Sequence, residues 1–163
     1  MRNVWFVLKF ILACILGFVL QLTLHEMGHA VFALITGNEV VNVSLGIVSY
    51  AVVNVLNEWS IPVISVGSFV FPIVVCAFLA LFRSEFVRCL SAVILTITTI
   101  QLAINAVAIL SVKDVSRLQT YDLGVCVASA NWNNVILSVV SIITVITLIV
   151  WVISNLKKIV DEV

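Results

Sequence analysis

Long apolar runs alternate with short polar stretches along the whole chain. Each of these runs is close to or above the roughly 20 residues that an α-helix needs to cross a bilayer. Backbone polar groups in lipid need partners within their own segment, so such runs are expected to be helical. We expect helices over about residues 4–35, 61–82, 89–110 and 135–153. The pattern therefore predicts an α-helical polytopic membrane protein with about four transmembrane helices.

Residues 39–59, which follow the first apolar run, have a different pattern. From Val41 to Ile47 apolar residues alternate with small or polar ones, which is the period of a β-strand. Aromatic and β-branched residues continue from Tyr50 toward Trp59. We expect a short β-hairpin or small sheet here, with its turn near Gly46 or Ser49, inside a single domain that spans residues 1–163.

Composition agrees with a membrane protein. The 163 residues are 63% hydrophobic and only 10% charged, whereas soluble domains carry far more charge. The formal net charge is zero and gives no indication of a nucleic-acid partner, so the surroundings expected are the lipid bilayer. The four cysteines show no paired spacing, and we interpret them as small hydrophobic residues of the helices.

One motif, His25 to His29, contains side chains that could bind a metal ion and take part in catalysis. From Phe10 to Ile35 the only charged or imidazole side chains are His25, Glu26 and His29, and such groups are costly at membrane depth unless they are paired or bind a metal. Residues four apart lie on the same face of a helix, so both histidines point the same way. This H-E-x-x-H spacing is the zincin signature, in which the histidines hold zinc and the glutamate is the general base. A chance polar cluster between helices is the alternative. We predict one Zn²⁺ per chain.

A catalytic zinc site needs a third protein ligand, and the chain has no third histidine. With four spans, the end of the first helix shares its membrane side with residues 36–60 and 111–134. The carboxylates available there are Glu39, Glu58, Asp114 and Asp122. We favour Asp122, which precedes an apolar stretch, and keep Asp114, between Lys113 and Arg117, as the alternative.

A stripe of polar residues runs along one face of the third expected helix. Thr98, Gln101 and Asn105 fall at positions i, i+3 and i+7, which share one helix face. Hydrogen bonds between helices explain Thr98 and Gln101. For Asn105 the alternatives are such a bond or contact with a substrate near the metal. Gln21, one turn before His25, is interpreted as a helix-contact residue.

At this point the sequence resembles the site-two protease family of intramembrane zinc metalloproteases, in particular its small bacterial and archaeal branch. The resemblance covers roughly residues 20–130. It is carried by Leu24-His25-Glu26-Met27-Gly28-His29-Ala30, Thr36-Gly37-Asn38, the β-rich segment, Val66-Gly67-Ser68, and Asn105 ahead of Asp122. The chain departs from larger members, which have proline after the asparagine and glycine after the aspartate.

The resemblance implies His25, His29 and Asp122 as zinc ligands, Glu26 as general base, and a multi-pass location in a prokaryotic cell membrane. The implied activity is hydrolysis of peptide bonds in membrane-spanning or membrane-associated proteins. A strand edge within residues 40–55 would receive the unwound substrate. The alternatives are a non-catalytic membrane chaperone or regulator that binds partner helices, and a metal transporter. Lysines and arginines place the zinc toward the outer face and the resemblance places it near the cytoplasm, so orientation stays open.

Overall fold

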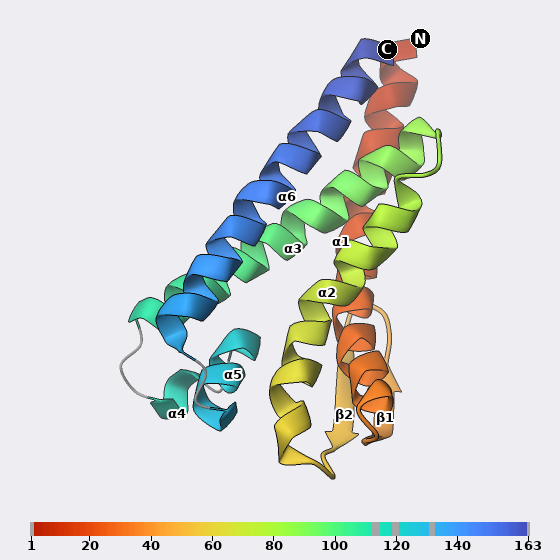
Figure 1. Ribbon diagram of the computed structural model, residues 1–163. Helices are drawn as coiled ribbons and strands as arrows, with labels where there is room; N and C mark the ends of the chain where they lie inside the picture. The colour runs from red at the N-terminus through yellow and green to blue at the C-terminus, as the bar shows by residue number, and fades with distance from the viewer. Residues whose placement is uncertain (1, 112–114, 119–120, 131–132, 163) are drawn as a thin grey trace.

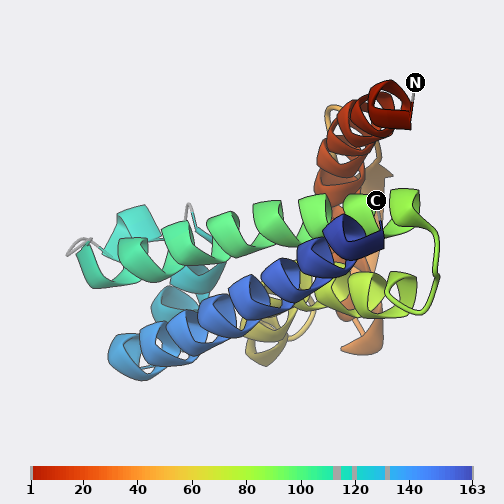
Figure 2. The same ribbon diagram turned by 90° about the horizontal axis from the view of Figure 1, so that it is seen from above.

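The computed structural model describes residues 2–111, 115–118, 121–130 and 133–162 and shows a bundle of long helices with a small sheet beside one end (Figure 1). The long helices are α1 (Arg2–Ile35), α2 (Ile61–Leu79), α3 (Glu85–Ser111) and α6 (Asn134–Glu162). Each contains a segment that is long and apolar enough to cross a membrane. The N-terminal end of α1 and the C-terminal end of α6 lie at the same end of the bundle (Figures 1 and 2).

The four expected helices are confirmed, with differences at their ends. The second helix stops at Leu79, before the predicted residue 82. The third starts at Glu85, four residues before the predicted residue 89. The fourth continues to Glu162, well past residue 153. Polar residues at these ends are compatible with helix once the apolar part of the segment has nucleated it.

The predicted hairpin is confirmed as a two-stranded antiparallel sheet of β1 (Glu39–Ser44) and β2 (Tyr50–Asn54). Val43 lies opposite Ala51, and a register shift falls between Val40 and Asn42. In the turn Gly46 has a φ of 129°, a conformation that favours glycine, and its N–H donates to Ser49 Oγ at 3.0 Å. The sheet lies beside the second half of α1 (Figure 1).

Short helices complete the end of the bundle that is remote from the termini. They are a 3₁₀ helix, η1 (Glu58–Ser60), and two α-helices, α4 (Val115–Leu118) and α5 (Asp122–Ala130). Helix α5 packs against both α2 and α3, while α6 packs mainly along α3. The end of α1 that carries the histidines thus shares one end of the bundle with the hairpin and with α5 (Figure 1).

Two glycines let α1 and α2 approach closely. A Cβ atom on Gly28 would lie 2.4 Å from the carbonyl oxygen of Gly67, and one on Gly67 would lie 2.5 Å from the Phe32 ring. Neither position has room for a side chain. Gly28 therefore marks a close approach of α1 to α2. This contact sets the distance between the histidine-bearing turns of α1 and the wall formed by α2.

Candidate metal centre

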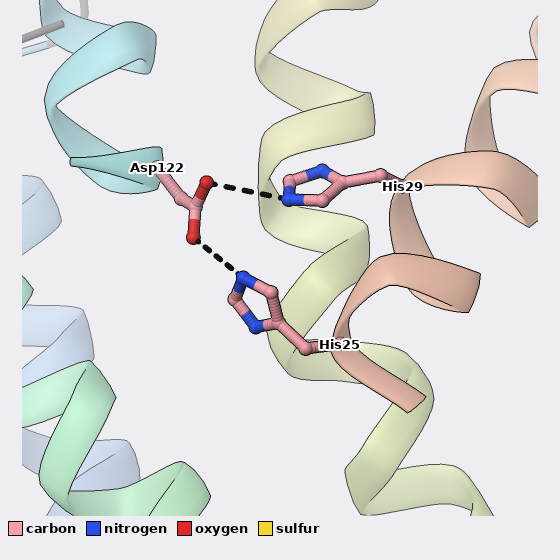
Figure 3. Close-up of side chains that lie close together, drawn as sticks. All are labelled: His25, His29 and Asp122. Atoms are coloured by element: carbon pink, nitrogen blue, oxygen red, sulfur yellow. Dashed lines mark ion pairs between the residues drawn. The ribbon is translucent and has the colours of Figure 1, made fainter. Parts of the chain in front are cut away.

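The two histidines lie one turn apart on α1 and point away from it in the same direction (Figure 3). Their ring centroids are 5.2 Å apart and the ring planes are nearly perpendicular. The Phe69 ring on α2 lies nearly perpendicular to the His25 ring, with centroids 5.7 Å apart. Helical spacing alone places the two rings, as the sequence predicts.

Asp122, the first residue of α5, faces both rings from the opposite side (Figure 3). Its Oδ2 lies 3.2 Å from His25 Nε2, and its Oδ1 lies 3.3 Å from His29 Nε2. These are the three residues of the described part of the chain that could jointly hold a metal ion, with one ligand atom from each within 4.8 Å of the others. The side chains are 16%, 17% and 26% exposed, so the cluster is enclosed and yet reachable by a water molecule.

The donor atoms of these three residues are of the kinds that zinc binds. Zinc binds imidazole nitrogen and carboxylate oxygen at about 2.0–2.2 Å, so two such ligands at the tetrahedral angle lie about 3.3–3.5 Å apart. The observed nitrogen–oxygen distances are 3.2 and 3.3 Å, each to a different oxygen of Asp122, so the carboxylate would turn one oxygen toward both rings to close a tetrahedral site. Two histidines and one carboxylate leave a fourth position open, as catalytic zinc sites do. The donor set therefore fits the predicted metal, although it does not by itself select zinc among divalent ions.

The outer nitrogens of the two imidazoles have different surroundings. His29 Nδ1 lies 3.1 Å from the backbone carbonyl oxygen of Ile64 in α2, which fixes the proton on Nδ1 and leaves Nε2 free to bind. His25 Nδ1 is buried and has no hydrogen-bond partner. The side-chain oxygen of Gln21, one turn earlier on α1, is also buried and without a partner.

Residues of α2 and α3 hold the start of α5, where Asp122 lies. The buried Ser68 hydroxyl lies 3.4 Å from Oδ2, and the Leu123 N–H donates to Asn105 Oδ1 at 3.1 Å. Burial by itself raises the pKa of the Asp122 carboxyl, but the two imidazoles outweigh burial and hold the pKa below its ordinary value. One turn on, burial raises the pKa of the Cys126 thiol to about 12, and its sulfur donates to the carbonyl oxygen of Pro62 at 3.5 Å.

Glu26 accepts a hydrogen bond from the hairpin. Its Oε2 lies 3.0 Å from the backbone nitrogen of Ala51 in β2. In an antiparallel pair successive N–H groups point alternately toward and away from the partner strand. The Ala51 N–H is therefore on the free edge of β2, and this edge, not that of β1, faces the carboxylate. No sequence pattern indicated this contact, because a backbone donor leaves no mark in the residue type.

Asn105 uses both ends of its amide. Its Nδ2 donates to the carbonyl oxygen of Gln101 at 3.0 Å, while its Oδ1 accepts from Leu123. The polar stripe on α3 thus makes hydrogen bonds to neighbouring helices. As expected, the side-chain oxygens of Thr98 and Gln101 accept from Gln21 Nε2 of α1, at 3.2 and 2.6 Å. Contact between Asn105 and a substrate stays a prediction, and it would require one of these bonds to open.

The remaining candidates for the third ligand do not join the cluster or cannot be placed. Glu39 accepts from the Asn54 side chain at 3.1 Å on the outside of the hairpin. Glu58 lies in η1 and is exposed. Asp114, the alternative ligand, lies outside the described residues. Of the carboxylates that the structure describes, Asp122 is the one that faces both histidines.

An apolar cavity of about 410 Å³ adjoins the centre between α2 and α6. Phe69, which contacts His25, and Leu123, which follows Asp122, both line it. The hydroxyl groups of Ser141 and Thr144 on its α6 side donate to carbonyls of their own helix. The cavity thus offers apolar surface next to the candidate ligands.

Comparison with known proteins adds no relative: no protein-family model, no curated protein and no solved structure matches the chain. The resemblance to the site-two protease family therefore rests on the residues of the motif and on the order of the segments that follow it.

Proposed function

We propose that this protein is an intramembrane zinc metalloprotease whose long apolar helices cross the membrane. The observation that carries the proposal is the convergence of His25, His29 and Asp122 from two elements far apart in sequence, at ligand spacing, inside an apolar bundle. Three such groups are costly at membrane depth without a common partner. Glu26 stands beside the first ligand, where the zincin signature places the general base.

In the proposed reaction His25, His29 and Asp122 hold Zn²⁺, which when bound lowers the pKa of a water molecule and polarises the scissile carbonyl. Glu26 accepts the proton of the attacking water and returns it to the leaving amine, which completes the hydrolysis of the peptide bond.

The free edge of β2 is the proposed binding surface for the substrate. A transmembrane substrate is helical and has its amides bonded internally, so the segment to be cut has to unwind. An unwound segment needs new partners for its backbone, and the free edge of β2, where the Ala51 N–H now donates to Glu26, would supply them once the substrate binds. Proposed substrates are therefore membrane-spanning or membrane-associated proteins with a segment that unwinds easily.

The alternative is a non-catalytic membrane chaperone or regulator with the same fold. Such a protein would use the β2 edge and the apolar cavity to hold partner segments, and it would not need a carboxylate beside two histidines. Glu26 therefore favours the protease, and its substitution separates the two functions.

The test is proteolysis by the purified protein in liposomes, with a single-span model protein that carries an Asn-Gly-Pro helix-destabilising segment as the probe. Wild type should cleave the probe, and Glu26→Gln should reduce the rate at least about 100-fold while zinc content is unchanged. Glu39→Gln, which changes a carboxylate on the outside of the hairpin, is the matched control and should cleave normally. Equal cleavage by wild type and Glu26→Gln would refute Glu26 as the base. Zinc binding without cleavage of this or any other unwinding probe favours the chaperone.

A further inference from the structure

Of the two candidate imidazole ligands, only His25 lacks a partner for its outer nitrogen. In a neutral imidazole one nitrogen carries the proton and the other accepts, so a His25 that binds metal through Nε2 carries its proton on Nδ1. That N–H is buried and has no partner among the described residues, whereas His29 donates to Ile64. Ligating histidines almost always donate this proton, so an acceptor for His25 is to be expected nearby.

The other buried side-chain atom without a partner in the described part of the chain is the oxygen of Gln21. Gln21 is fully buried and lies four residues before His25, on the same face of α1. The unpartnered acceptor, Gln21 Oε1, and the unpartnered donor, His25 Nδ1–H, therefore lie on adjacent turns of α1. A small turn of the Gln21 side chain, or one bridging water, joins them.

The helix α3 fixes which end of the Gln21 amide is available. The Thr98 hydroxyl donates its proton to the carbonyl oxygen of Ile94, so toward Gln21 it can act only as an acceptor. The amide nitrogen of Gln21 donates to Thr98 and to Gln101 Oε1. The nitrogen end is thus held against α3, and the oxygen end is left for α1.

We propose that Gln21 is a positioning residue for the metal centre: its side-chain oxygen accepts the hydrogen bond of His25 Nδ1–H and orients the ring toward the ion. This inference rests on the proposed zinc site. The same face of α3 also reaches the other side of the ion, because Asn105, which donates to the backbone carbonyl of Gln101, accepts from the N–H of Leu123 beside Asp122. One turn of α3 then positions ligands on both sides of the ion.

The test is zinc affinity, measured by competition with a chelator, on full-length protein in detergent. Gln21→Met keeps the length of the side chain and removes the acceptor, and it should weaken zinc binding about 10- to 100-fold. Gln21→Glu keeps an acceptor oxygen and should bind zinc close to the wild-type level. Thr98→Val is the matched control, because it removes a partner of the same amide without touching the acceptor, and it should change the affinity far less than Gln21→Met does.

The Co²⁺-substituted proteins supply a readout independent of folding stability. The visible absorption of tetrahedral Co²⁺ should shift in Gln21→Met, where the His25 ring is free to turn, and should match wild type in Thr98→Val. Wild-type zinc affinity and spectrum in Gln21→Met would overturn the role of Gln21 while leaving the proposed function intact. Equal weakening in Gln21→Met and Gln21→Glu would assign the loss to packing and also overturn it. A folded wild type that binds no zinc would overturn the proposed function itself.

Discussion

Helices α1 and α5 carry the two sides of the candidate centre, and they hold their ligands in different ways. The histidines of α1 belong to a helix that runs from Arg2 to Ile35, so their relative position follows from helical geometry alone. Asp122 begins α5, which ends at Ala130 and is too short to be stable by itself. The position of α5 depends on hydrogen bonds that its residues make to Asn105, to Ser68 and to the carbonyl oxygen of Pro62. The α5 side of the centre is therefore the more sensitive to distant substitutions.

The largest loss of zinc affinity is expected from a substitution of Gly124 in α5. A Cβ atom there would lie 2.0 Å from the carbonyl oxygen of Leu118, so Gly124→Ala has to displace α5 from α4 and move Asp122. We expect zinc affinity to fall more than about tenfold. Gly17→Ala is the control, because it also creates a clash, at 2.7 Å from Val93 Cγ1 and 3.0 Å from Val93 Cβ, but on the face of α1 toward α3 and not at α5. Equal zinc affinities in the two variants would contradict a sensitive α5.

The second-largest loss of zinc affinity is expected from a substitution of Gly28 in α1. Gly28→Ala would press a methyl group against the backbone of Gly67, and overpacking of this kind costs about 1–3 kcal/mol. The thermal midpoint in detergent should fall clearly. Zinc affinity should fall less than in Gly124→Ala, since the two histidines keep their relation to one another. A larger loss of zinc affinity than in Gly124→Ala would reverse the comparison.

Removal of the Asn105 side chain should have a smaller effect again. Asn105→Ala leaves the buried N–H of Leu123 without its acceptor, at a cost of about 1–3 kcal/mol, and loosens the start of α5. Zinc affinity should fall, because Asp122 at the start of α5 is then held less firmly. Thr99→Val is the matched control on the same helix, because the Thr99 hydroxyl bonds only the Leu95 carbonyl of its own helix. Unchanged zinc affinity in Asn105→Ala would show that α5 is held by other contacts.

The smallest effect on metal binding is expected in the hairpin. Ala51→Pro removes the N–H that donates to Glu26, and this N–H lies outside the ladder, where proline is tolerated on an edge strand. Zinc content should be unchanged, while cleavage of the single-span probe slows. Val52→Pro removes an N–H that points to β1 and should disrupt the hairpin instead. Unchanged cleavage by Ala51→Pro would exclude a role for this edge.

The same contrast explains how much the sequence could predict. The long helices, the hairpin and the pairing of His25 with His29 follow from local periodicity, and the structure has them. Asp122 was chosen from four carboxylates by topology and by its place before an apolar stretch, and the structure brings it to the histidines.

The remaining contacts depend on tertiary approach, which leaves no local pattern. The Ile64 carbonyl that fixes His29 and the Ala51 amide that meets Glu26 are backbone groups and could be of any residue type. The use of both ends of Asn105 likewise depends on how α5 returns to α3. For Gln21 the sequence indicated a helix contact, which is present, but not the unpartnered oxygen beside His25.

The most direct test of the central claim is the zinc stoichiometry of detergent-purified protein, measured for wild type, His25→Ala, Asp122→Ala and Asp114→Ala. We predict about one zinc per chain in wild type and in Asp114→Ala, and its loss in His25→Ala and Asp122→Ala. A folded wild type without zinc, or an Asp122→Ala variant that keeps it, would contradict the centre described above.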